Sequence, residues 1–208
     1  MFNINRNNYF EDLKNNEIFT PRVILDQIFN YLGNFFKDRN FETILENSFG
    51  KGDILFEIIK KFPNKNIFGY EIKKEYFEFV KKQLDKTNIK LFNKSFLNSD
   101  LNHKYDLIIS NPPFAIKERR GLWRDFLHLS FKLLSNKGVM IFILPSYWKQ
   151  NTNSTFINYV EYYPQLNFLP IFKGTFFKNS LSCDIVIIDK NNKNNYWKNL
   201  YNNTLNLK

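Results

Sequence analysis

Short runs of apolar residues, each of strand length, recur along the chain. The run at 139–144 (Val-Met-Ile-Phe-Ile-Leu) is apolar at every position, which is typical of a strand buried on both faces of a sheet. The pattern predicts strands at residues 43–45, 67–70, 89–92, 105–109, 139–144, 166–172 and 184–188.

Between most of these runs, apolar residues lie three or four positions apart, which predicts amphipathic helices. The first helix is expected to start at Thr20-Pro21, with Thr20 as its cap and Pro21 at its first position. Asp53 is expected to cap the second helix, and a further helix is expected at 156–162. The residues expected on buried helix faces are Val23, Ile24, Ile28, Leu32, Ile54, Leu55, Ile58, Ile59, Tyr76, Phe77, Val80, Leu84, Trp123, Phe126, Leu127, Phe131 and Leu134.

This alternation of strands and helices predicts an α/β fold with a doubly wound, Rossmann-like sheet. We expect seven strands, mostly parallel, with the last two forming a C-terminal antiparallel hairpin. Residues 1–190 are expected to form one domain, in which 1–16 are an N-terminal extension, and 191–208 a polar tail.

Unusual segments follow the predicted strands at their carboxyl ends, at 46–53, 71, 95–97 and 111–114. In doubly wound sheets, ligands bind at that edge. Gly50 and Gly52 in the first strand-to-helix turn allow a tight turn and close approach of a ligand. Glu46 before them suits a cationic ligand better than a phosphate, and Glu71 can accept hydrogen bonds from both hydroxyls of a ribose.

Asn111-Pro112-Pro113-Phe114 carries the most specific chemistry of these segments. Two successive prolines restrict the backbone, so a carboxamide and a backbone carbonyl can be held in place as two acceptors. Such a pair can bind both hydrogens of a planar amino group, while Phe114 offers a ring on which a flat base can stack.

Composition limits the partners and the cofactors. The formal net charge of +10 favours nucleic acid as a partner, although Lys-rich and Phe-rich composition also follows from AT-rich codons. A single cysteine, Cys183, with only His103 and His128 beside it, excludes an internal disulfide and predicts no metal site. Without an apolar segment long enough to cross a bilayer, a cytoplasmic protein is expected, or its nucleoid-associated or viral equivalent.

The motif after the fourth strand resembles the catalytic motif of adenine-specific amino-methyltransferases that use S-adenosylmethionine. Further segments resemble restriction–modification adenine methylases in the same order: Ile18-Phe19-Thr20-Pro21 before the first strand, the cofactor loop at 45–53, the strand and turn at 143–148, and the closing hairpin at 172–188. The resemblance covers roughly residues 17–190 and implies the class I methyltransferase fold. Asn47, Phe49 and Ser95 depart from the family pattern, which usually has a proline, a small residue and an aspartate, respectively, at these positions.

The resemblance also implies roles for individual residues. The residues implied to bind S-adenosylmethionine are Phe19, Thr20, Pro21, Glu46, Asn47, Ser48, Gly50, Gly52, Glu71, Ile72, Ser95, Phe96 and Asn111, with the ring of Phe96 stacked on the cofactor adenine. The residues implied to be catalytic are Asn111, Pro112, Pro113 and Phe114. The residues expected to bind the substrate are Phe114, Lys117, Arg119, Arg120, Phe176 and Phe177.

The expected reaction is methyl transfer to the exocyclic amino group of adenine in DNA. Alternatives are adenine in RNA, most plausibly ribosomal RNA, the glutamine side chain of a protein, and a nucleic-acid-binding subunit that has lost turnover. Related DNA enzymes usually carry a target-recognition domain, whereas here only a short tail follows the last strand. Loops, a specificity subunit or a homo-oligomer are therefore expected to read the target.

Overall fold

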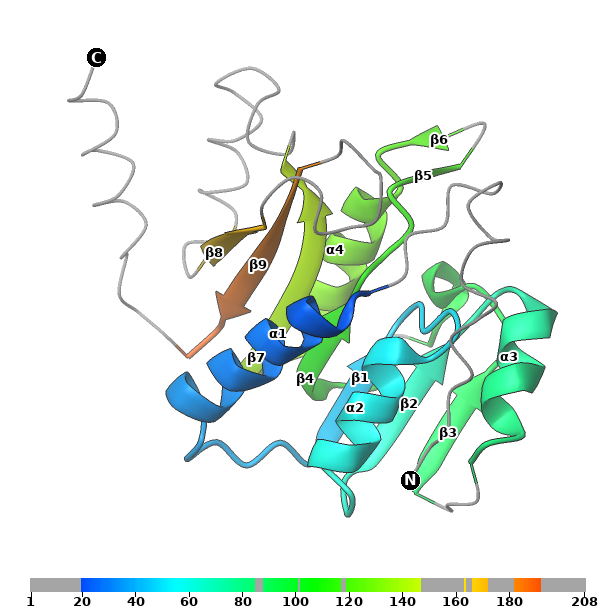
Figure 1. The fold of residues 1–208 in the computed structure, drawn as a ribbon, viewed down its shortest axis with the longest axis horizontal. Coiled ribbons are helices and arrows are strands. Elements are labelled where there is room, and N and C mark those ends of the chain that lie inside the picture. Colours follow the sequence, from blue (N-terminus) through cyan, green and yellow to red (C-terminus); the bar gives the residue numbers. More distant parts are fainter. Residues whose placement is uncertain are drawn as a thin grey trace.

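The computed structural model describes residues 20–84, 88–100, 102–116, 119–146, 163, 166–171 and 182–191. Four α-helices, one 3₁₀ helix and nine strands lie within these ranges (Figure 1). In chain order the elements are α1 (Arg22–Phe35), β1 (Thr43–Glu46), α2 (Asp53–Lys61), β2 (Asn66–Tyr70), α3 (Lys74–Lys81), β3 (Ile89–Phe92), η3 (Phe96–Asn98), β4 (Tyr105–Ser110), β5 (Ala115–Ile116), β6 (Arg119–Arg120), α4 (Trp123–Leu133), β7 (Leu134–Pro145), β8 (Leu166–Ile171) and β9 (Cys183–Asp189).

The main sheet has seven strands in the order β3-β2-β1-β4-β7-β9-β8. The pairs β1–β2, β1–β4, β2–β3 and β4–β7 are parallel, whereas β7–β9 and β8–β9 are antiparallel. The chain therefore winds outward from β1 to one edge, returns to β4, and then builds the other half. The expected seven-stranded, mostly parallel sheet with a C-terminal antiparallel hairpin is confirmed.

Helices cover both faces of this sheet (Figure 1). Helices α1, α2 and α3 pack on one face with Ile141 and Ile143 of β7, and α4 packs on the other face with Met140 and Phe142. Since successive side chains of a strand point to opposite faces, a strand buried on both sides must be apolar at every position. This requirement explains the unbroken apolar run from Val139 to Leu144.

The caps of two helices differ by one residue from the prediction, one residue later for α1 and one residue earlier for α2. Helix α1 has Pro21 as its N-cap and α2 has Gly52, and neither cap uses a side-chain hydrogen bond. Thr20 and Asp53 therefore do not cap these helices. Val23 is half exposed, also against expectation, because the buried stripe of α1 runs along its other side, through Ile24, Leu25, Ile28, Phe29 and Leu32.

The structure also contains a hairpin that the sequence pattern did not predict. Strand β5 pairs antiparallel with β6 directly after the 111–114 segment, where only a loop was expected. Strand β7 begins at Leu134 rather than at 139, and its register with β4 shifts between Tyr105 and Leu107. The expected helix at 156–162 and the expected extension and tail lie outside the described residues, apart from Asn191. Among the helices described, none has both the length and the apolar character needed to cross a membrane.

Candidate active site

Three adjacent parallel strands bring the predicted segments together. Strands β2, β1 and β4 lie side by side and run in the same direction, so Glu71, Glu46 and Asn111 stand at one edge of the sheet. The loops that follow these strands therefore form one continuous site, as expected for a doubly wound sheet.

The glycine turn after β1 needs glycine at its second position. Gly50 and Gly52 both have positive φ, 52° and 91°, a backbone conformation that other residues rarely adopt. A Cβ atom on Gly52 would also lie 2.7 Å from the ring of Phe56. The backbone N–H of Gly52 donates to the carbonyl of Phe49 at 2.7 Å, which closes the turn.

Glu71 is held by the same turn. Its Oε2 accepts from the backbone N–H of Gly50 at 2.8 Å, and its Oε1 accepts from that of Lys73 at 2.7 Å. Burial raises the pKa of the Glu71 carboxyl, and these backbone hydrogen bonds partly oppose the rise. Each carboxylate oxygen has a second lone pair, so both can still accept from a pair of hydroxyls. Beside Glu71, Ile72 is 68% exposed and presents an apolar surface to a flat ring.

Glu46 is the least satisfied charged group of this edge. The residue is 2% exposed, and its Oε2 has no hydrogen-bond partner among the residues that the structure describes. Burial raises the pKa of its carboxyl well above the usual range, and the nearby carboxylates of Asp53 and Glu71 raise it further. A buried acceptor without a partner fits a ligand that brings a donor or a positive charge. S-adenosylmethionine carries both an ammonium and a sulfonium group.

The side chain of Phe49 points into the core and not toward the carboxyl edge of the sheet. Its ring is buried in the core beneath the loop, with its centroid 6.5 Å from that of Phe77. The ring occupies the space left by Gly69 of β2, where an added Cβ atom would lie 2.9 Å from it. A bulky residue is tolerated at this position because the neighbouring strand has no side chain there.

The expected stacking of Phe96 on the cofactor adenine is wrong for this conformation. The ring is 1% exposed and packs against Tyr70 and Phe126, with centroid distances of 5.6 Å to each. Ser95 caps η3 by accepting from the backbone N–H of Leu97 at 3.3 Å. The Phe96 ring and the Ser95 hydroxyl thus shape the turn after β3.

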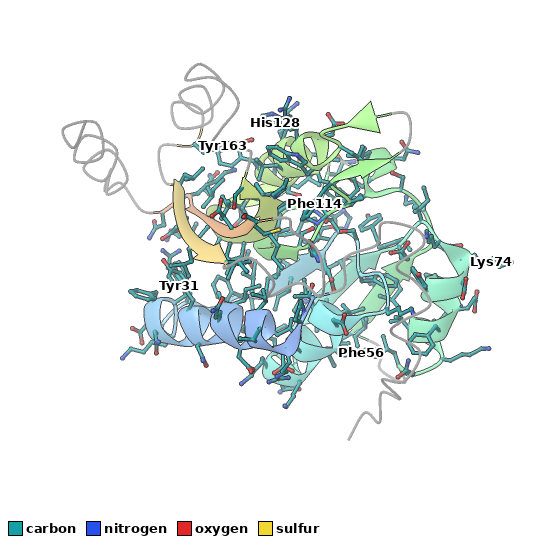
Figure 2. The ribbon with its side chains drawn as sticks, turned by 45° about the horizontal axis from the view of Figure 1, so that its top comes forward. Tyr31, Phe56, Lys74, Phe114, His128 and Tyr163 are labelled. Atoms are coloured by element: carbon teal, nitrogen blue, oxygen red, sulfur yellow. The ribbon has the colours of Figure 1, made fainter. Side chains whose placement is uncertain are left out.

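The 111–114 turn is held by hydrogen bonds from two other segments of the chain. The side-chain amide of Asn111 donates from Nδ2 to Oγ1 of Thr20 at 3.1 Å, and the Asn111 carbonyl accepts from Oγ of Ser48 at 3.4 Å. Pro112 is buried. Phe114 is partly exposed and lies at the middle of the molecule, in contact with the cores on both faces of the sheet (Figure 2).

Asn47 differs from its expected role. Its side chain turns away from the cofactor edge and is buried, where Nδ2 donates to Oγ of Ser130 at 2.9 Å and Oδ1 accepts from the hydroxyl of Ser110. Sequence reasoning did not point to Ser110 or Ser130. In the sequence, these two positions stand out only as small polar residues within an otherwise apolar strand or helix face.

Several expected site residues cannot be placed. Phe19, Lys117, Phe176 and Phe177 lie outside the described residues, and Arg119 and Arg120 are described only as backbone of β6. The structure thus brings together Thr20, Pro21, Glu46, Gly50, Gly52, Glu71, Ile72 and the 111–114 turn.

Comparison with known proteins agrees with this geometry. Residues 14–162 match the family model described as methyltransferase small domain. The modification methylase CviBIII of Paramecium bursaria Chlorella virus NC1A is 29% identical over 141 residues, which are 62% of this chain and 37% of that protein. The release factor glutamine methyltransferase of Buchnera aphidicola is 29% identical over 104 residues, 48% of this chain and 38% of that protein.

The chain thus spans well under half the length of these curated relatives. Among solved structures, the plantazolicin methyltransferase BpumL, in complex with S-adenosylhomocysteine and a substrate analogue, superposes with a TM-score of 0.58 at 12% identity. The superposition covers 80% of this chain and 83% of that one. The cofactor of this family and fold is S-adenosylmethionine. The chain belongs to the methyltransferase small domain family and has the class I S-adenosylmethionine-dependent methyltransferase fold.

Proposed function

We propose that the chain transfers the methyl group of S-adenosylmethionine to the exocyclic amino group of adenine in DNA. The observation that carries this proposal is the hydrogen bond from the Asn111 amide to Thr20. An amide whose nitrogen donates to a buried hydroxyl presents its oxygen on the opposite side, as an acceptor. A planar amino group needs such an acceptor together with a backbone carbonyl, which the Pro112-Pro113 turn supplies.

Bound S-adenosylmethionine would supply an electrophilic methyl group on a sulfonium. Oδ1 of Asn111 and the backbone carbonyl of Pro112 each accept one hydrogen of the amino group, which holds the nitrogen and favours its pyramidal, nucleophilic form. Methyl transfer would form one C–N bond and break one C–S bond, with S-adenosylhomocysteine as the leaving group and one proton of the amino group lost to solvent. The residues contribute alignment and preorganised acceptors.

The base would be held by Phe114 and the phosphates by the hairpin that follows it. Phe114 is partly exposed and follows Asn111 by three residues, so a base that has left its helix could stack on its ring. The β5–β6 hairpin then carries Lys117, Arg119 and Arg120 within six residues of Phe114. The net charge of +10 raises the encounter rate with polyanions.

DNA is the proposed polymer because CviBIII is named a modification methylase. Target selection is proposed to use a specificity subunit or a second copy of the chain. We also propose that the protein is located in the cytoplasm, of a cell or of an infected host. We propose that it acts as the methylase of a restriction–modification system.

A labelling assay tests the function and ranks its alternatives. The purified chain is incubated with S-adenosylmethionine labelled on its methyl group and, in separate reactions, with duplex DNA, total RNA and a protein extract. We expect label in DNA that digests to N6-methyladenine, and far less of it with Asn111→Ala. Label only in RNA, or only on glutamine in protein, would replace DNA by that substrate. Binding of the cofactor without label in any polymer would identify a subunit that has lost turnover.

A further inference from the structure

A buried polar network lies beneath the catalytic edge. The Asn47 carboxamide is at its centre: Nδ2 donates to Oγ of Ser130 at 2.9 Å and Oδ1 accepts from the hydroxyl of Ser110, while Oγ of Ser48 lies 3.3 Å from Oδ1. Ser48 also lies 3.4 Å from the Ser110 hydroxyl. The carboxamide thus uses at least two of its hydrogen-bonding positions within the protein.

The network joins three elements that are far apart in the sequence. Asn47 belongs to the cofactor loop after β1, Ser110 is the last residue of β4, and Ser130 lies in α4. Asn47 is 2% exposed and the two serines are 0% exposed, so neither serine side chain can touch a bound cofactor or a base. Removing one partner would leave a buried donor or acceptor unsatisfied, which is costly.

The network continues into the catalytic turn. Ser110 directly precedes Asn111, and the Ser48 hydroxyl, which reaches Oδ1 of Asn47, also lies within 3.4 Å of the Asn111 carbonyl. The loop that would hold the cofactor and the turn that would hold the amine are therefore tied through one carboxamide. Methyl transfer requires the two reacting atoms in line and close together, and small misplacements reduce its rate steeply.

We propose that Asn47, Ser110 and Ser130 form a positioning network that fixes the cofactor loop against the catalytic turn. None of the three is a catalytic residue, because each acts through the backbone that it holds. The part of the inference that concerns turnover rests on the proposed function, whereas the part that concerns cofactor binding does not.

The decisive variant is Ser130→Ala, which is remote from both ligands. We expect the dissociation constant for S-adenosylhomocysteine, measured by isothermal titration calorimetry, to rise about tenfold, because the loop loses its anchor. Turnover at saturating cofactor should fall by a similar factor. Ser110→Ala removes the hydrogen bond to the other end of the Asn47 carboxamide and should show the same two effects. The proposal can therefore still be tested if one of the two variants does not fold.

A double-mutant cycle identifies the carboxamide as the intermediary. In an Asn47→Ala background, Ser130→Ala should change the dissociation constant by less than about twofold, because its effect passes through Asn47. Independent effects that multiply in the double variant would overturn the proposal.

Ser135→Ala is the matched control. The Ser135 hydroxyl donates to Oδ1 of Asp106 at 3.0 Å, at the opposite end of β4, and its loss should lower the melting temperature without changing cofactor affinity. If Ser130→Ala behaves like Ser135→Ala, the network is only structural and the proposal fails. If cofactor affinity responds as expected but no polymer is labelled, the network stands and the proposed function falls.

Discussion

The side chains of Asn111 and Thr20 are joined by a hydrogen bond of 3.1 Å although they lie 91 positions apart in the sequence. Thr20 is buried, so its hydroxyl is a well-shielded acceptor for the Asn111 amide nitrogen. Thr20, two residues before α1, therefore contacts the 111–114 turn directly.

Asn111→Ala should remove most of the turnover while leaving cofactor binding nearly intact. The change deletes the side-chain acceptor for the amino group, and loss of one preorganised partner at a reacting centre costs about 10²–10³-fold in rate. Methyl transfer to DNA and calorimetric binding of S-adenosylhomocysteine provide the two measurements. A loss of cofactor binding as large as the loss of turnover would contradict the assigned role.

Thr20→Val should reduce turnover at saturating cofactor by about tenfold, because valine keeps the shape of threonine but cannot accept from the Asn111 amide. Thr20→Ser retains the hydroxyl and should stay within about threefold of the native rate. Single-turnover rates for the three proteins make the comparison. Equal rates for the valine and serine variants would show that the hydrogen bond does not orient the carboxamide.

Gly69→Ala should destabilise the protein by about 1–3 kcal/mol through overpacking. The new methyl group would lie 2.7 Å from Leu91 and 2.9 Å from the Phe49 ring. Urea unfolding gives the free energy of unfolding. Phe49→Leu in the same chain should recover part of the loss, because it removes atoms from the crowded side. If Gly69→Ala unfolds at the same urea concentration as the native chain, the Phe49 ring does not need the space that glycine leaves at position 69.

Glu46→Gln should stabilise the ligand-free protein more strongly as pH rises. The pKa of Glu46 is higher in the folded state than in the unfolded chain, so the folded protein keeps the carboxyl proton to a higher pH. The native protein therefore loses stability as pH rises above the ordinary pKa of 4.5. Glutamine does not titrate, so the difference in melting temperature should grow in favour of the variant between about pH 5 and pH 8, by about 2–4 °C for each kcal/mol.

The same variant should bind S-adenosylhomocysteine about tenfold more weakly at neutral pH, since the negative acceptor is gone. The native chain measured beside it at each pH is the control. A melting-temperature difference that stays constant across this pH range would mean that Glu46 keeps its ordinary pKa.

The layered fold could be predicted from the sequence because burial on both faces leaves a strong local signal. Runs such as 139–144 and 105–109 admit few other interpretations once helical stripes separate them. The carboxyl-end position of Glu46, Glu71 and Asn111 then followed from the sheet itself, since consecutive parallel strands end at one edge. The β5–β6 hairpin was missed because strands of two residues carry no periodic pattern.

Side-chain partners that are distant in sequence could not be predicted. Asn47 and Ser130 lie 83 positions apart, and an asparagine in a loop gives no sign that its carboxamide turns inward. Phe96 was misread for a related reason: an aromatic residue beside a cofactor loop fits either a stacking face or a core position. Only the positions of Tyr70 and Phe126 decide between the two.

The position of β9 constrains the order in which the chain can fold during synthesis. Strand β9 lies between β7 and β8, yet it is the last of the three to leave the ribosome. Until Cys183–Asp189 emerge, one edge of β7 and the paired edge of β8 lack the partner strand that they have in the described part of the folded sheet. An apolar strand with unpaired backbone groups is prone to pair with other chains. A nascent chain that stalls before this strand is therefore expected to be more prone to aggregation than the complete sheet.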